Sequence, residues 1–155
     1  MPKDTSRHPK TPRLANKKAR FNFEILEKIE AGIVLKGTEV KSLRLGNASI
    51  GEAFAQIIDG QATLHNFQIQ PYAQGNRFNH DPKRTKQLLL HRREIRKLAS
   101  KVQIKGQTLI PLAVYFKRGL AKVELALARG KTHRDKRQDE RKREDQREID
   151  RAQRK

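Results

Sequence analysis

The sequence predicts a mainly β protein with short α-helices, in which a single small antiparallel barrel is followed by a basic C-terminal tail. Two tight-turn pairs, Asp59-Gly60 and Arg118-Gly119, each separate two apolar runs and therefore predict β-hairpins. Large apolar residues are concentrated between positions 21 and 129, and almost none lie outside this range. Short strands joined by tight turns favour a closed or nearly closed barrel.

The distribution of apolar residues divides the chain into three parts. We expect a disordered basic N-terminal arm at residues 1–15, the barrel at residues 16–129 and a basic tail at residues 130–155. Neither end can bury enough apolar surface to offset the entropy of ordering it, so both are expected to be disordered in the isolated protein.

The first strand and helix follow from the pattern of residues 23–45. Residues 23–35 alternate apolar and polar side chains, which predicts a strand, and Gly32 predicts a bulge or bend within it. Residues 38–45 predict a short helix with Thr38 as its N-cap. Three apolar side chains of this helix are expected to face inward: Val40, Leu43 and Leu45.

The rest of the barrel is predicted by periodicity and turn residues. We expect a hairpin of strands 52–58 and 61–69, followed by a loop at residues 71–82 and a short strand at residues 86–90. A helix at residues 91–104 and a second hairpin of strands 108–117 and 120–129 complete the barrel. In the last strand, alternation places Val123, Leu125 and Leu127 on one face and Lys122 on the other. About six strands and two helices result, and an oligonucleotide-binding type of barrel is the natural candidate.

The net charge of +19, from 36 basic and 17 acidic residues, predicts a polyanionic partner. Each Lys or Arg that docks on a phosphate releases counterions and strengthens binding. The alternative is an unusually basic protein with no nucleic-acid partner. The N-terminus has no apolar stretch of a secretory signal, and no apolar run approaches the ~20 residues of a membrane helix. We therefore expect a soluble, cytoplasmic protein that does not bind membranes.

No enzyme signature is found, so we expect neither catalysis nor a cofactor. The chain has no cysteine, which excludes disulfides, thiol nucleophiles and thiolate metal sites. None of its five histidines has the spacing of a zinc site, and Asn79-His80-Asp81 is better interpreted as a polar loop than as a metal site. Because aromatic residues are few, we expect recognition of a folded RNA by its shape and backbone rather than by many stacked bases.

The tail has the composition of a helix that forms on a partner. It contains neither Gly nor Pro after Gly130, and Asp139 precedes Arg143 by four positions, as Asp150 precedes Arg154. Such pairs contribute only about 0.2–0.5 kcal/mol each, so the free tail is expected to be marginally helical and to become helical against a polyanion. The alternative is a solubilising tail with no ordered state.

Four motifs follow one another at residues 16–21, 30–44, 81–95 and 130–137, so that they are spread over most of the chain. In order and spacing, they resemble the motifs of the SsrA-binding protein (small protein B) family. The resemblance implies an oligonucleotide-binding-like barrel that grips the tRNA-like domain of transfer-messenger RNA. The RNA-contact positions that it implies are Glu30, Leu89 and His91, and the basic residues expected at the RNA are Lys17, Lys18, Arg20, Lys41, Arg44, Arg84 and Lys86.

Each of the three contact positions also has a simpler interpretation. Leu89 is by default a core strand residue, but alternation places it on the opposite face from Leu88 and Leu90, so it is expected to be exposed and free to pack on a base or ribose. His91 is by default the cap of the following helix, and Glu30 a solvated strand residue. A carboxylate such as Glu30 repels phosphate, so its use would be to accept hydrogen bonds from base edges or to orient neighbouring cations.

The tail motif implies a second partner, the 70S ribosome with its small-subunit rRNA. In the family the tail enters the decoding centre and becomes helical in the empty messenger channel. The positions that match are Lys131, Asp135, Lys136 and Arg137, and the tail contacts expected at the decoding centre also include His133 and Arg134. Arg134 stands where the family usually has His or an aromatic residue, so either its guanidinium or His133 would have to supply the stacking.

The resemblance therefore implies a monomeric, non-catalytic adaptor that delivers transfer-messenger RNA to stalled ribosomes for rescue and tagging. A further implied partner is the GTP-bound elongation factor Tu on the alanyl form of that RNA. Two alternatives remain at this stage. One is a basic ribosomal protein whose extensions are permanently bound to rRNA, and the other is an RNA-modifying enzyme with an appended basic tail.

Overall fold

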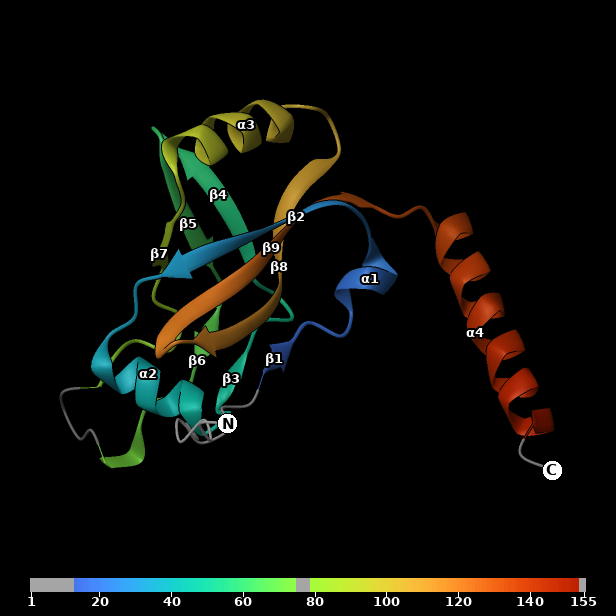
Figure 1. The fold of residues 1–155 in the computed structure, drawn as a ribbon, viewed down its shortest axis with the longest axis horizontal. Coiled ribbons are helices and arrows are strands. Elements are labelled where there is room, and N and C mark those ends of the chain that lie inside the picture. Colours follow the sequence, from blue (N-terminus) through green and yellow to red (C-terminus); the bar gives the residue numbers. More distant parts are fainter. Residues whose placement is uncertain (1–12, 75–78, 154–155) are drawn as a thin grey trace, which may run out of the picture.

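The computed structural model describes residues 13–74 and 79–153 and is drawn in Figure 1. In chain order its elements are β1 (Leu14–Ala15), α1 (Ala19–Asn22), β2 (Phe23–Ile33), α2 (Gly37–Arg44), β3 (Ala48–Ser49), β4 (Phe54–Ile58), β5 (Gln61–His65), β6 (Gln68–Ile69), β7 (Lys86–Leu89), α3 (Arg92–Val102), β8 (Gln107–Lys117), β9 (Leu120–Gly130) and α4 (His133–Gln153). All strand pairs among the described residues are antiparallel, and the mainly β fold with short helices is confirmed.

Six of the strands close into a barrel. The order β8-β4-β5-β7-β2-β9 is continuous, and its two ends, β8 and β9, also pair with each other. β1 adds a further strand that pairs with Val114 and Ala113 of β8, so the ordered structure begins before residue 16, the boundary that the sequence predicts. Residues 1–12 of the expected arm lie outside the described residues.

Both predicted hairpins are confirmed, and their turns explain why these sequences form them. Asp59 and Gly60 have φ values of 51° and 75°, and Arg118 and Gly119 have φ values of 52° and 78°. Positive φ at both central residues gives a turn whose twist matches that of the flanking strands. The two hairpins are β4–β5 and β8–β9.

The bulge in β2 does not lie at Gly32, where the sequence predicts it. The register of β2 against β9 shifts between Ile25 and Glu27 instead. Gly32 permits a close approach between strands, because a Cβ atom added to it would lie 3.1 Å from the Cβ of Leu89 on β7. The glycine therefore makes room for Leu89.

Helix α2 begins one residue earlier than predicted. Its N-cap is Lys36, whose backbone N–H donates to the Glu39 carboxylate at 2.7 Å. Thr38 is not the cap, because its hydroxyl is hydrogen-bonded to Nδ1 of His80 at 2.8 Å. Leu43 is buried as expected, but Leu45 follows the helix and is 64% exposed, so its predicted inward position is wrong.

Two apolar clusters hold the barrel together. The larger fills the interior and includes Leu64, Leu109 and Val123, each at most 1% exposed. The second lies on the outer face of the β8–β9 hairpin, where Ala126 and Ala128 pack with Ala19 of α1 and with Ile110 and Leu112. Both faces of β9 are therefore apolar near its end, whereas alternation predicts only one. Over the described ranges, no helix has the length and apolar character that crossing a membrane requires.

Candidate nucleic-acid interface

A pocket of about 340 Å³ lies where β2, β7 and β9 meet the start of α3. We refer to it as the Leu89 pocket, and its lining residues are Glu30, Gly32, Leu89, Leu90, His91, Glu94 and Lys122. Gly32 pairs with Leu89 on one side and with Lys122 on the other, so the absence of a side chain at Gly32 leaves space between them. The structure thus brings together the three positions Glu30, Leu89 and His91, which are separated by up to 61 positions in the sequence.

Leu89 and His91 present their side chains to solvent at the mouth of the pocket. Leu89 is 53% exposed while Leu88 is buried, which confirms the alternation predicted for β7. His91 occupies the N-cap position of α3 but makes no capping hydrogen bond with its side chain, which is 90% exposed. Its Nε2 lies 4.0 Å from Oε1 of Glu94. An exposed Leu beside an exposed planar ring offers an apolar surface on which a base or ribose can pack.

Glu30 is held by neighbours on its own side of the sheet. It accepts a hydrogen bond from the hydroxyl of Tyr115, and Nζ of Lys117 lies 3.6 Å from its carboxylate. The Tyr115 hydrogen bond and the Lys117 charge hold the pKa of Glu30 below its usual value. Burial and the Glu30 carboxylate together raise the pKa of Tyr115 to about 12. Glu30 is therefore an ionised, positioned acceptor at neutral pH, suited to base N–H or ribose hydroxyl groups rather than phosphate.

Lys122, together with Leu90 and Glu94, lines the pocket although the sequence does not predict it as an RNA contact. Alternation along β9 places it away from the barrel interior, and the structure pairs it with Gly32. Its position beside Glu30 and Leu89 depends on the register between β2 and β9. That register cannot be predicted from neighbouring residues, because Lys122 lies 90 positions after Gly32.

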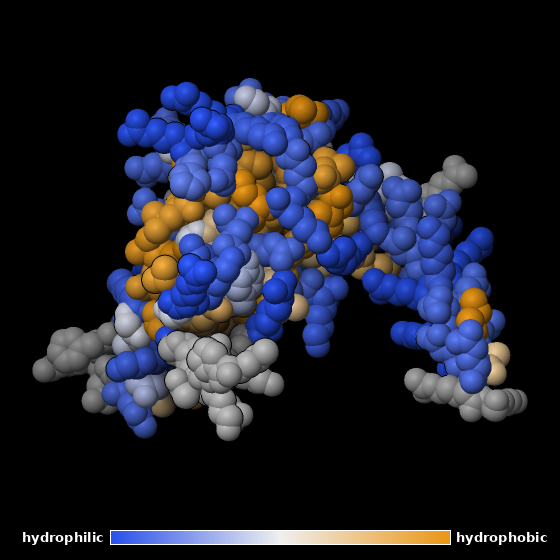
Figure 2. Space-filling view, in the orientation of Figure 1, coloured by the Kyte–Doolittle hydropathy of each residue, from blue (hydrophilic) through white to orange (hydrophobic). Residues whose placement is uncertain are grey.

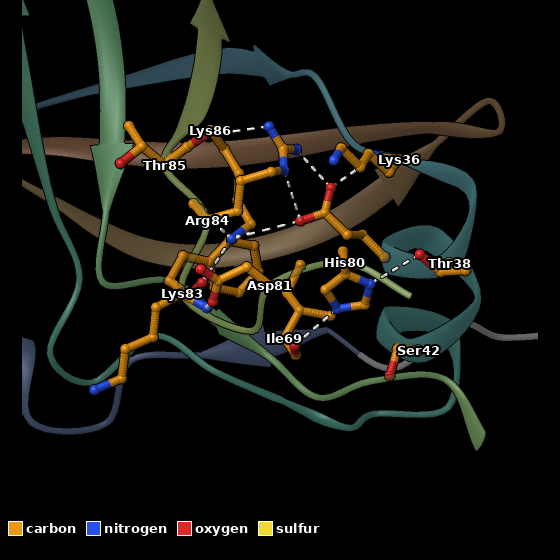
Figure 3. Close-up of polar contacts among 12 residues, drawn as sticks. Lys36, Thr38, Ser42, Ile69, His80, Asp81, Lys83, Arg84, Thr85 and Lys86 are labelled. Carbon is orange, nitrogen blue, oxygen red and sulfur yellow. Dashed lines mark hydrogen bonds and ion pairs between the residues drawn. The ribbon is translucent and has the colours of Figure 1, made fainter. Parts of the chain in front are cut away.

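Two of the basic residues predicted at the RNA are instead parts of an internal network, drawn in Figure 3. Nζ of Lys86 is fully buried and donates to the backbone carbonyls of Phe67 at 2.8 Å and Arg84 at 2.6 Å. The Arg84 guanidinium donates to both carboxylate oxygens of Glu39 and to the carbonyl of Val34. The expectation that Lys86 contacts RNA is therefore wrong, and Arg84 has its donors committed inside the protein.

Glu39 is the centre of this internal network and is itself fully buried. Burial alone raises the pKa of a carboxyl, but the hydrogen bonds from Arg84 and from the Lys36 N–H outweigh it, so the pKa of Glu39 is lowered. Burial lowers the pKa of Lys86, and the Glu39 carboxylate, 3.6 Å away, opposes that shift. The network connects α2 to β7 and to the segment that precedes it.

His80 belongs to the same region and is a structural residue of its loop. Its Nδ1 is hydrogen-bonded to Thr38 and its Nε2 to the carbonyl of Ile69 at 2.9 Å, and it is 5% exposed (Figure 3). Within residues 13–74 and 79–153, the structure contains no group of three His, Cys, Asp or Glu side chains that could hold a metal ion. The Asn79-His80-Asp81 sequence is thus a hydrogen-bonded loop.

The remaining predicted basic residues are exposed but do not line the Leu89 pocket. Lys41 and Arg44 lie on α2, at the opposite end of the barrel from α3 (Figure 1), over the rings of Tyr72 at 5.5 Å and Phe116 at 4.9 Å. Lys17, Lys18 and Arg20 lie in and before α1 and are exposed. An RNA that touches all of these residues must therefore extend beyond the pocket.

The tail is a 21-residue helix, α4, which stands apart from the barrel except near α1 (Figure 1). This differs from the predicted disordered tail, and its first residues explain why a helix starts here. Thr132 caps the backbone N–H of Asp135, while the Asp135 carboxylate accepts from the Thr132 N–H and hydroxyl. This reciprocal arrangement stabilises the first turn. The stacking predicted for His133 or Arg134 concerns side chains that lie outside the described part of the structure.

A junction between α1 and α4 holds the start of the tail helix. Lys131 donates through its Nζ to the carbonyl of Arg20 at 2.7 Å and to the Asp139 carboxylate, which lowers the pKa of Asp139. Asp139 thus pairs with Lys131 and not with Arg143, the partner that helical spacing predicts. Cations of α4 also lie over the Phe21 ring: Lys136 at 5.7 Å and Arg143 at 5.5 Å.

The fold and the pocket together define a small, strongly basic β-barrel protein of the kind that binds RNA. The SmpB protein family matches residues 13–155. The chain is 56% identical to the SsrA-binding protein of Pelotomaculum thermopropionicum, over 88% of this chain and 90% of that relative. It is also 56% identical to the SsrA-binding protein of Desulforudis audaxviator, over 95% and 96% of the two chains.

A solved structure supports the same family. The chain is similar, with a TM-score of 0.67 and 54% identity, to a chain of the structure described as "tmRNA-SmpB: a journey to the center of the bacterial ribosome". The similarity covers 79% of this chain and 86% of that one. This protein therefore belongs to the SmpB family of SsrA-binding proteins.

Proposed function

We propose that this protein is a non-catalytic adaptor of trans-translation, which binds transfer-messenger RNA and brings it to stalled ribosomes for rescue and tagging of incomplete proteins. The observation that carries this proposal is the Leu89 pocket, which gathers Glu30, Leu89 and His91 in one place. Relatives that are more than half identical are SsrA-binding proteins, and a similar chain comes from a tmRNA–SmpB structure in the ribosome.

The chemistry of the pocket suits a nucleoside of a folded RNA. Leu89 supplies apolar contact area, Lys122 a positive charge, and Glu30 and Glu94 hydrogen-bond acceptors. An acceptor directed at the ribose 2′-hydroxyl is one of the few ways in which a protein can distinguish RNA from DNA. We assign this pocket to the tRNA-like domain of transfer-messenger RNA.

The tail has a separate task in this proposal. Its basic residues, with Lys131, Lys136 and Arg137 among them, would contact small-subunit rRNA of the 70S ribosome in the decoding centre and the empty messenger channel. The GTP-bound elongation factor Tu on the alanyl RNA would be a further partner, and the protein would act as a monomer in the cytoplasm. The helix already present in α4 supports this assignment, because no folding from a fully unordered tail is then required.

The proposal is tested by recovering tagged full-length protein from cells and sequencing the bound RNA. We expect transfer-messenger RNA to be the dominant bound RNA. Ribosomes should carry far less than one copy of the protein each. A broad recovery of rRNA at one copy per ribosome would contradict the proposal and favour a permanent ribosomal protein.

Removing residues 131–155 tests the division between barrel and tail. We expect the shortened protein to bind transfer-messenger RNA with nearly unchanged affinity and to lose tagging on stalled ribosomes. Affinity is measured at a fixed salt concentration, because the electrostatic contribution changes steeply with salt. A large loss of affinity on deletion would show that the tail takes part in the same RNA contact as the barrel.

A further inference from the structure

The outer face of α3 carries a concentration of positive charge that the pocket does not include. Arg92, Arg93 and Arg96 are exposed, and none of them forms an ion pair with a carboxylate among the described residues. The opposite face packs on the barrel through Leu98, which is 3% exposed. Figure 2 shows hydrophilic side chains over the part of the surface formed by α3.

The lysines of the same helix behave differently. Nζ of Lys97 lies 3.7 Å from Glu27, and Lys101 forms a hydrogen bond with the same carboxylate. These contacts attach the far edge of α3 to β2. The basic residues of the helix therefore divide into lysines that pair with Glu27 and arginines that have no acidic partner in the part of the chain that the structure describes.

The arrangement of the three arginines is unfavourable for the helix itself. Arg92 and Arg93 lie in the first turn, at the positive end of the helix dipole, where cations are destabilising. Arg92 and Arg96 are four residues apart on one face, where like charges repel by about 0.2–0.5 kcal/mol. Local rules are broken in this way mainly at functional sites, and an anionic partner would relieve both unfavourable terms.

The Leu89 pocket indicates where that partner comes from. His91, the N-cap of α3, and Glu94 in its first turn line the pocket, so the pocket and the arginine face lie at the same end of the helix. The carboxylates of Glu30 and Glu94 disfavour a phosphate inside the pocket. A nucleoside bound there must therefore leave its flanking phosphates outside, on the rim that α3 forms.

We propose that Arg92, Arg93 and Arg96 form a phosphate-binding face for the backbone of the RNA whose nucleoside occupies the Leu89 pocket. A guanidinium can donate two parallel hydrogen bonds to one phosphate and is well suited to this role. This assignment rests on the proposed function, and the occupant is transfer-messenger RNA rather than rRNA. The arginines contribute affinity and orientation, while the pocket contributes selection of the nucleoside.

The test is binding of full-length protein to purified transfer-messenger RNA across a series of salt concentrations. The variant R92Q/R93Q/R96Q is expected to lose on the order of 10- to 100-fold in affinity near 0.1 M salt. The slope of log affinity against log salt should decrease in magnitude by about 2–3, since each phosphate contact contributes roughly 0.7–0.9. The circular dichroism spectrum should be unchanged and the protein should unfold at the same or a slightly higher temperature, because these side chains have no partner within the described residues and their charges disfavour the helix.

Two further variants serve as controls. R141Q/R147Q/R151Q removes the same number of charges from exposed positions of α4 and should leave affinity within about threefold. R92K/R93K/R96K keeps the charge and should retain most of the salt slope. Equal losses for the α3 and α4 variants, an unchanged slope, or a loss confined to ribosome association would each overturn the assignment. Wild-type protein that fails to bind transfer-messenger RNA would overturn the proposed function itself.

Discussion

The basic residues between positions 84 and 96 face two contrasting environments. Arg84 and Lys86 are turned toward the buried Glu39, and their donors are occupied by the carboxylate and by backbone carbonyls. Arg92 and Arg96, only a few residues later, are exposed and have no acidic partner among the described residues. Both groups contribute equally to the net charge, but only the second is available to an external anion. Charge counts alone therefore do not identify a nucleic-acid surface.

The largest effect on stability is expected from removing the carboxylate at the centre of the inward group. Glu39→Ala leaves Arg84 and Lys86 without their counter-charge in a buried site, where breaking such a pair costs about 3–5 kcal/mol. Urea unfolding followed by circular dichroism measures the loss. A decrease below about 1 kcal/mol would show that the inward group is as dispensable as a surface ion pair.

The pH dependence of the wild-type protein is a second check on Glu39. Because its pKa is lower in the folded state, the stabilisation is fully present above the unfolded value, about 4.5, and is lost as the pH falls through the folded value. In Glu39→Ala, the loss of stability at acidic pH that results from protonation of this carboxylate should be absent. Glu30→Gln, at an exposed carboxylate, serves as the matched control and should leave the free energy of unfolding nearly unchanged.

The pocket should show the reverse pattern, a loss of binding without a loss of stability. Leu89→Ala combined with His91→Ala removes contact area that a base or ribose would use, worth about 1–3 kcal/mol per stacked base. Both side chains are largely exposed, so the free energy of unfolding should change by less than about 0.5 kcal/mol. Gel-shift titration at fixed salt gives the affinity, and an unchanged value would remove both residues from the interface.

The smallest effect is expected at Phe21, whose ring lies beneath two cations of the tail helix at the protein surface. Phe21→Ala removes the ring beneath Lys136 and Arg143, and exposed cation–π contacts are worth about 0.5–1 kcal/mol each. Barrel stability should change little, but the direction of α4 relative to α1 should become less well defined. Because the chain has no cysteine, spin labels can be attached to introduced cysteines at positions 117 and 147. The distance distribution should broaden in Phe21→Ala and remain narrow in Phe21→Tyr.

Local features of this protein could be predicted from its sequence, and long-range ones could not. The turns at Asp59-Gly60 and Arg118-Gly119 and the exposure of Leu89 follow from a few neighbouring residues. The burial of Lys86 depends on Glu39, which lies 47 positions earlier, and the place of Lys122 depends on strand register. The residues around Lys86 do not indicate whether its side chain is buried or exposed, because this depends on the position of Glu39 in the fold.

The tail helix also has a mechanical consequence. With 21 residues, α4 is about 32 Å long, and its contacts with the body run from Lys131, which contacts Arg20, to Arg143, which lies over Phe21 about halfway along the helix. A rotation about these contacts is amplified along the second half of the helix, which is about 15 Å long, so a change of about 10° displaces the far end by about 3 Å. The few contacts at Phe21 and Lys131 therefore set the reach and aim of the whole tail. They make α1, a helix of four residues, the pivot of a lever.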